Sequence, residues 1–249
     1  MLAVVLVLVV LIGVGLGVYL GPIVKIGMEQ LGPKVAQVTV KVDGVDVALL
    51  SGSAALKGLV VGNPQGFATP QAISVGTVAI SLDPLSVTSN KILIHSVHVV
   101  SPEITFEGGI SRNNLSKILD NVTAFSKNVT PASGNSSTQS GNKPAPKIEV
   151  DDFLITGAKV HINITGVVSK DVSLPDIHLT DLGKENNGLT PSELTSAVLK
   201  AISSDTVSTV TSTIANLGQG VKGLGQNAAK TVGENVSKIT SSFGGLFGK

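Results

Sequence analysis

The feature that most constrains this chain is the stretch Leu2–Leu20, which runs for nineteen residues without a charge and consists almost entirely of Val, Leu, Ile and Gly. At about 1.5 Å of rise per residue, a helix of this length spans roughly 28 Å, close to the hydrocarbon core of a bilayer at about 30 Å. An isolated segment in lipid must satisfy its backbone hydrogen bonds internally, and a helix does so. We therefore predict a transmembrane anchor over residues 1–22, held in the bilayer by Leu2, Val10, Leu11, Tyr19 and Leu20.

The alternative for this stretch is a cleaved signal peptide. The apolar run exceeds the usual signal-peptide core of about 7–15 residues, no basic segment precedes it, and the residues around Gly21-Pro22 make a poor cleavage site. These features favour an uncleaved anchor. Charge gives little help with orientation, because only Met1 precedes the stretch while Lys25 and Lys34 follow it.

Composition excludes several function classes. The formal net charge is +1, which gives no electrostatic basis for binding nucleic acid. Cysteine is absent, so disulfides, thiolate metal sites and cysteine nucleophiles are excluded. Aromatic residues make up 3% of the chain and Trp is absent, which argues against base-stacking surfaces.

The middle of the chain is predicted to be a β-rich domain over residues 35–185. Before it, residues 23–34 are predicted to form a short juxtamembrane helix that ends at Gly32-Pro33, with Met28 and Leu31 facing lipid or the body. From residue 35 the hydrophobic period becomes two, as in strands with one buried face. The clearest strands are expected at 38–42, 73–82, 91–100, 102–107, 159–166 and 172–182.

A helix and a loop interrupt this domain. Apolar residues recur at helical spacing from Leu115 to Phe125, which predicts a helix over 113–128 with Ser111, Asn113 or Asn114 as its N-cap. Residues 129–146 are small, polar and bracketed by proline, which indicates a flexible loop. The strands over 147–182 are too few to hold a core of their own, so we expect them to complete the same sheet.

Several motifs in this domain carry a family resemblance. They are the Gly-punctuated segment 49–67, the Ile-Ser-Leu-Asp-Pro turn at 80–84, the Ser-Pro-Glu-Ile-Thr-Phe-Glu strand at 101–107, and the Asn-Asn-Leu and Ile-Leu-Asp-Asn motifs at 113–115 and 118–121. In this order they resemble the N-terminal region of the AsmA-like family, bacterial envelope proteins with an N-terminal membrane helix. The resemblance covers residues 1–185. It implies a mainly β, α+β fold with a curled antiparallel sheet, a half-trough like that of chorein-type bridge proteins, whose inner face holds lipid tails.

The C-terminal region, residues 190–247, is predicted to be a long amphipathic helix. It begins at Thr190-Pro191-Ser192-Glu193, a typical helix start, and apolar residues then recur at steps of three or four. Two surfaces could hold its apolar stripe: the protein itself or a partner, or the membrane interface. The residues expected to bind the membrane or a partner are Ile239, Phe243, Leu246 and Phe247.

No catalytic or metal-binding motif is recognisable. His95 and His98 are three residues apart in a predicted strand, so we expect them to point to opposite faces and not to share a metal ion. Ser51-Gly52-Ser53 lacks the Gly-x-Ser-x-Gly pattern of a nucleophile elbow, and the Gly-rich tracts lack the ending of a phosphate-binding loop. We therefore predict a protein that is not an enzyme and needs no cofactor.

These observations lead to two hypotheses about function. The resemblance implies a single-pass protein of the bacterial inner membrane, with the bulk of the chain in the periplasm, that handles phospholipid locally or serves envelope biogenesis through an apolar β-trough. The alternative is a structural accessory subunit that scaffolds a larger membrane complex, through other envelope proteins or through self-association, without lipid cargo. A continuous dry trough favours the first hypothesis and a filled core favours the second.

Overall fold

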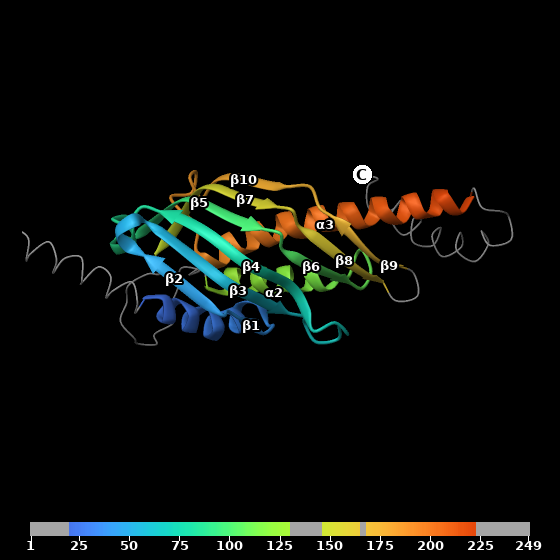
Figure 1. Cartoon of the computed structure of the whole chain (residues 1–249). Coiled ribbons are helices and arrows are strands. Elements are labelled where there is room, and N and C mark those ends of the chain that lie inside the picture. Colours follow the sequence, from blue (N-terminus) through green and yellow to red (C-terminus); the bar gives the residue numbers. More distant parts are fainter. Residues whose placement is uncertain (1–19, 130–145, 165–167, 223–249) are drawn as a thin grey trace, which may run out of the picture.

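The computed structural model describes residues 20–129, 146–164 and 168–222, which form an α+β structure dominated by one open sheet (Figure 1). Within these ranges the sheet has ten strands. They are β1 (Val40–Lys41), β2 (Gly44–Ala48), β3 (Ser53–Gly62), β4 (Gln71–Leu82), β5 (Lys91–Val100), β6 (Glu103–Glu107), β7 (Lys147–Thr156), β8 (Lys159–Ile164), β9 (Val168–Ser173) and β10 (Ile177–Leu182).

Three helices accompany the sheet in the described ranges. The N-terminal helix covers residues 20–36, and the other two are α2 (Asn114–Val129) and α3 (Pro191–Lys222). Short 3-10 turns follow β2 and β4, at η1 (Leu49–Ser51) and η2 (Ser86–Thr88). The helix predicted over 113–128 corresponds to α2, and the described part of the helix predicted over 190–247 corresponds to α3.

Several strands that follow one another in the sequence join end to end into longer strands. The pairings Ile73↔Ile104 and Val78↔Val99 belong to one register along β4, so β5 and β6 form a single long strand with a short interruption. The same continuity joins β1 to β2, β7 to β8 and β9 to β10. Across the sheet the order is β1–β2, β3, β4, β5–β6, β7–β8 and β9–β10. The expected joining of residues 147–182 to the same sheet is confirmed.

The antiparallel prediction fails at one position in the sheet. β5 runs parallel to β7, and β6 runs parallel to β8, whereas all other pairs in the described ranges are antiparallel. The reason is the connection between β6 and β7, which contains α2. A crossover through a helix returns the chain in its starting direction, whereas a hairpin reverses it.

The interruptions lie on one line across the sheet, which we call the fold line. The strand registers align six residues along it, one from each long strand: Asp43, Gly58, Gly76, Ser101, Gly157 and Pro175. Three of them have left-handed backbone, with φ of 60° at Gly58, 49° at Ser101 and 64° at Gly157. At this line each long strand has one residue more than strict alternation of side chains allows. Val99 and Ile104 are therefore both buried on the same side of the sheet, although they are five residues apart.

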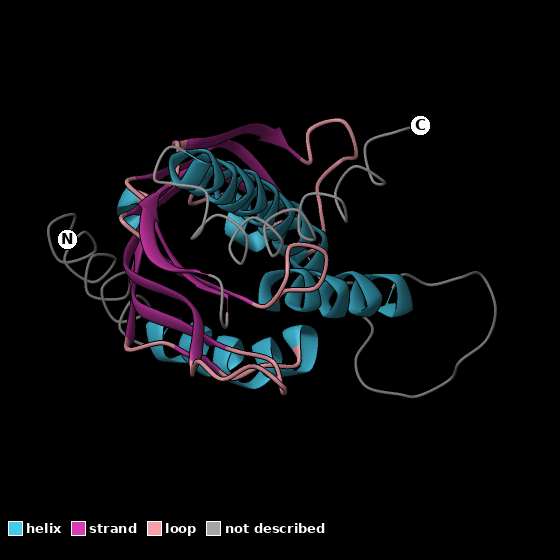
Figure 2. Ribbon diagram, turned by 90° about the vertical axis from the view of Figure 1, so that its right-hand side faces the viewer, coloured by secondary structure: helices cyan, strands magenta, loops and turns pink. Residues whose placement is uncertain are grey.

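The sheet curves around the helices, as Figure 2 shows. α2 and α3 lie against its inner face, and the N-terminal helix lies along the β1–β2 side. The buried apolar residues of the sheet, α2 and α3 form a single core. Its fully buried members include Ile104, Phe106, Leu115, Ile118, Val122, Val150, Val160, Ile162 and Val210.

Local side-chain bonds set the helix ends. Asn113 caps α2, because its Oδ1 accepts the Ser116 N–H at 2.8 Å while Ser116 Oγ accepts the Asn113 N–H at 3.1 Å. At α3, Glu193 Oε2 accepts the Thr190 N–H at 2.8 Å, which completes the predicted capping box. The predicted helix end at Gly32-Pro33 is wrong. The helix continues to residue 36, because a proline in its last turn loses only one backbone bond and the Gln37 N–H still bonds the carbonyl of Pro33 at 3.0 Å.

Candidate interaction surfaces

The inner face of the sheet is occupied by the chain's own helices. Val150 of β7 and Val160 of β8 are fully buried, and so are Val122 of α2 and Val210 of α3. All four belong to the same apolar core. At these positions the trough predicted from the sequence is filled by protein side chains.

The side of α3 that faces the core is not purely apolar. Ser203 is buried there, and Thr206 is completely buried. Thr206 Oγ1 has no hydrogen-bond partner within the described structure. An unpaired buried hydroxyl costs roughly 1–3 kcal/mol, so α3 contacts the sheet less favourably than an all-apolar helix would.

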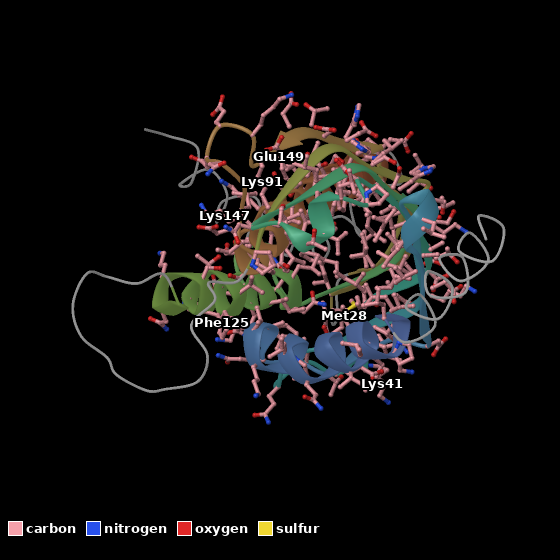
Figure 3. The ribbon with its side chains drawn as sticks, turned by 90° about the vertical axis from the view of Figure 1, so that its left-hand side faces the viewer. Met28, Lys41, Lys91, Phe125, Lys147 and Glu149 are labelled. Atoms are coloured by element: carbon pink, nitrogen blue, oxygen red, sulfur yellow. The ribbon has the colours of Figure 1, made fainter. Side chains whose placement is uncertain are left out.

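The inner side of the N-terminal helix is attached to β1 and β2 by polar bonds and close packing. Glu29 Oε1 accepts the Val42 N–H at 3.0 Å, and Lys25 Nζ donates to the carbonyl of Asp43 at 3.1 Å. Both bonds fall where β1 gives way to β2. Met28 points into the body beside them (Figure 3) and packs against the core.

Two glycines let this helix approach the sheet closely. A Cβ at Gly32 would lie 2.8 Å from the Val40 side chain, and one at Gly21 would overlap the carbonyl of Val45. The two positions are eleven residues apart and so lie on one side of the helix. Gly27, on the other side, has open space around it.

The outer side of the N-terminal helix is apolar and exposed. The exposed fractions are 62% for Ile23, 42% for Val24, 51% for Ile26 and 58% for Leu31. We call these four residues the apolar stripe. Of the two residues predicted to face lipid or the body, Met28 faces the body and Leu31 is exposed.

The opposite edge of the sheet, formed by β9 and β10, pairs with no further strand among the described residues. It is divided by Pro175, and Asp181 has a left-handed φ of 55°. Proline and irregular backbone limit uncontrolled strand addition. Short stretches of this edge nevertheless leave backbone groups available.

A shallow cleft of about 320 Å³ lies between α2 and α3. A hydrogen bond of 3.1 Å joins Thr123 Oγ1 and Ser196 Oγ across it. The carboxylate of Glu193 at its rim caps α3, and the hydrogen bonds from the Thr190 N–H and hydroxyl lower the pKa of Glu193. The cleft is lined by Thr123, Ser126, Lys127, Glu193, Ser196, Ala197 and Lys200.

The buried carboxylate of Glu107 fastens the loop after β3 to the start of α2. It accepts the Ala68 N–H at 2.5 Å, the Thr69 N–H at 2.8 Å and the Thr69 hydroxyl. Asn114 continues the network, because its Oδ1 accepts the Glu107 N–H at 3.0 Å. Burial raises the pKa of Glu107, but the hydrogen bonds from Thr69 and Ala68 outweigh it and the pKa is lowered. These hydrogen bonds join segments of the chain to one another, so the network has a structural role.

The histidines lie on the outer surface of the sheet. His95 contacts Asp151 at 3.2 Å, and His98 contacts Thr156 at 3.3 Å. The prediction that His95 and His98 point to opposite faces is wrong, because both are exposed. The register of β4 and β5 shifts at Ser81/Leu82, so Ile94 and Val97 both face the core and both histidines face outward. Among the described residues no group of three or more His, Asp or Glu could hold a metal ion.

Most of the predicted contact residues lie outside the described ranges. This holds for Leu2, Val10, Leu11 and Tyr19 of the anchor, for the loop over 130–145, and for Ile239, Phe243, Leu246 and Phe247. Leu20 is the first described residue and begins the described part of the N-terminal helix. In residues 20–129, 146–164 and 168–222 no helix has the length and apolarity needed to cross a membrane.

Comparison with known proteins adds no relative: no family model, curated protein or solved structure matches this chain.

Proposed function

We propose that this chain is a membrane-anchored, non-enzymatic scaffold protein of the bacterial cell envelope. The observation that carries the proposal is the filled inner face of the sheet, where α2 and α3 supply the core residues Val122 and Val210. A sheet occupied by its own helices has no apolar trough left to hold a lipid tail at these positions. What remains for other molecules is the outside of the body.

Three features support the remaining parts of the proposal. The uncharged stretch Leu2–Leu20 has the length and composition of a membrane anchor. The resemblance of residues 1–185 to the AsmA-like family supports an envelope location. The β9–β10 edge offers unpaired backbone groups to the strand of a partner, the usual chemistry of β-strand addition.

The test uses single cysteines, because the natural chain has none. Full-length Thr180→Cys carries a short photo-crosslinker on the exposed β10 edge, and Thr77→Cys carries the same group on exposed Thr77 of the interior strand β4. After illumination in native membranes, the scaffold proposal expects one adduct of discrete mass from Thr180→Cys and none from Thr77→Cys. Equal, diffuse labelling of both positions would contradict partner binding at this edge.

Local lipid handling is the second candidate, and one observation favours it. The unpaired Thr206 hydroxyl weakens the contact between α3 and the sheet, so acyl chains could compete with α3 for the apolar inner face. Native mass spectrometry with lipid extraction on gently purified full-length protein separates the candidates. Stoichiometric phospholipid, increased by Val210→Ser at the α3 contact, would support lipid handling. A lipid-free body carrying a fixed partner would support the scaffold.

A further inference from the structure

We propose that the apolar stripe of the N-terminal helix lies in the interface of the lipid bilayer, at the boundary between headgroups and acyl chains, and so sets the orientation of the sheet relative to the membrane. The inference rests on the proposed membrane anchoring. It adds a second lipid contact, made by the folded body itself.

The stripe is a coherent surface. At about 100° per residue, Ile23, Ile26 and Leu31 fall on one side of the helix. Gly27, Gln30 and Lys34 lie on the same side, opposite the glycines that contact the sheet. A helix at the surface of a soluble protein normally turns its polar side to water. This helix departs from that pattern: Lys25 and Glu29 bond the sheet beside the core contacts of Met28, while Ile23, Ile26 and Leu31 face outward.

Position in the chain identifies the occupant. The helix over residues 20–36 follows the uncharged stretch Leu2–Leu20 directly in the sequence. Residues directly after an anchor lie close to the bilayer. At a rise of about 1.5 Å per residue, Ile23 is about 5 Å and Leu31 about 17 Å from Leu20 along the helix. An amphipathic helix next to a membrane buries its apolar side about 5–10 Å into the boundary between headgroups and acyl chains.

Charge fits the same occupant. Lys34 is exposed on the stripe side at the far end of the helix, and exposed Lys41 of β1 lies beside the helix (Figure 3). Lysines that flank an apolar face contact lipid phosphates while their stems cover apolar surface. Glu29 is turned inward to the Val42 N–H, which keeps its carboxylate away from the headgroups.

The attachment of the helix converts lipid contact into orientation. Close approach at Gly21 and Gly32, together with the Glu29 bond to Val42, fixes the rotation of the helix against β1 and β2. With the stripe in the interface, the β1–β2 side of the sheet faces the bilayer and the β9–β10 edge faces away from it. A free tether would leave every orientation open.

The test places an environment-sensitive fluorophore at one position of the full-length chain, in Ile26→Cys, Leu31→Cys and the matched control Val100→Cys. Val100 is as exposed as Ile26, at 51% each, but lies on β5. Each protein is reconstituted into vesicles of phosphatidylethanolamine and phosphatidylglycerol, with or without lipids that carry a quencher on the acyl chain. Iodide in the buffer probes access from water.

The expected result is a blue-shifted emission for Ile26→Cys and Leu31→Cys, with quenching by the acyl-chain quencher several-fold stronger than for Val100→Cys and weaker quenching by iodide. Equal behaviour at all three positions would overturn the inference. Protection from iodide without acyl-chain quenching, together with disulfide cross-linking between two unlabelled copies of the Ile26→Cys protein, would also overturn it and assign the stripe to a second copy. Alkaline carbonate extraction separates the two proposals: release of the protein contradicts the anchor, whereas retained protein with water-exposed labels contradicts only the stripe.

Discussion

The N-terminal helix and α3 both flank the same sheet, but they use opposite chemistry. α3 turns Val210 and Ile214 into the core, with exposed fractions of 0% and 3%. The N-terminal helix attaches through two glycines, Lys25, Glu29 and the core contacts of Met28 and Ala36, and leaves Ile23 and Leu31 exposed. One helix completes the fold and the other presents a surface.

This difference separates a helix that stabilises the body from one that exposes an apolar surface. A helix that stabilises the body through the hydrophobic effect must bury its apolar side, as α3 does. A helix whose apolar side faces outward adds little to the stability of the isolated body, so those side chains serve an external surface. Three sets of variants test this division and one tests the body that both helices flank, from the largest expected effect to the smallest.

The strongest test makes the same substitution on both helices. Ile214→Ala removes buried methyl groups from α3 and is expected to lower the free energy of unfolding by roughly 2–5 kcal/mol. Ile26→Ala on the exposed stripe is expected to change it by less than about 0.5 kcal/mol. Urea unfolding of both proteins in mild detergent, followed by circular dichroism, gives the two values. Comparable losses would break the comparison, because Ile26 would then be a core residue.

A second pair tests the glycine contacts of the N-terminal helix. Gly21→Ala pushes a Cβ against the carbonyl of Val45 and is expected to destabilise the attachment by about 1–3 kcal/mol. Gly27→Ala meets open space and is expected to be stabilising by up to about 1 kcal/mol through helix propensity. Amide hydrogen exchange of residues 20–36 measures both effects. If Gly21→Ala left exchange in this helix unchanged, close packing at Gly21 would not hold it to the sheet.

Acid is expected to weaken the body through Glu107. Its pKa is lowered in the fold, so the stability it contributes is present above the ordinary value of 4.5 and is lost as the pH falls through the folded pKa. Glu107→Gln removes the charged acceptor, and we expect a loss of about 1–3 kcal/mol at neutral pH and a flatter decline of stability as the pH falls below 4.5. Thermal unfolding across this range checks it. An unchanged slope in Glu107→Gln would assign the acid sensitivity to other carboxylates.

The smallest effect concerns the start of α3. Thr190→Ala removes the hydroxyl of the capping box and is expected to cost about 1 kcal/mol, seen as faster amide exchange in the first turn of α3. The N-terminal helix serves as the internal control, because it lies along the β1–β2 side of the sheet, away from α3 (Figure 2). Faster exchange in both helices would mean that they unfold as one unit, and the contrast between them would then be one of surface only.

The sequence predicted local structure well and connectivity less well. Period-two alternation located β4 and β5, and the Thr190–Glu193 pattern located the start of α3, because these signals are local. The parallel pairing of β5 with β7 depends on where α2 packs, which no local pattern carries. The outward position of both His95 and His98 depends on a register shift in a neighbouring strand, which is again not local.

For the candidate surfaces, too, local features were predictable from the sequence and features set by long-range packing were not. The helical character of residues 23–34 was recognisable, but the end of the helix was placed too early, since Gly32-Pro33 resembles a helix stop. The inner role of Gly32 follows from the Val40 side chain, which only the folded chain brings near. Exposure of Leu31 and burial of Met28 could not be assigned, because a helix with mixed faces does not reveal which side meets the sheet.

The fold line has a consequence for how this chain can change. Side chains along a strand alternate between the two faces of the sheet, and at this line the alternation shifts by one residue in all six long strands together. Deleting Gly76 alone would remove the shift from β4 and turn Val78 and Ile80 toward water, while the side chains of the neighbouring strands kept their faces. The six positions therefore constrain one another as a set, and the lengths of strands far apart in the sequence are tied to one another.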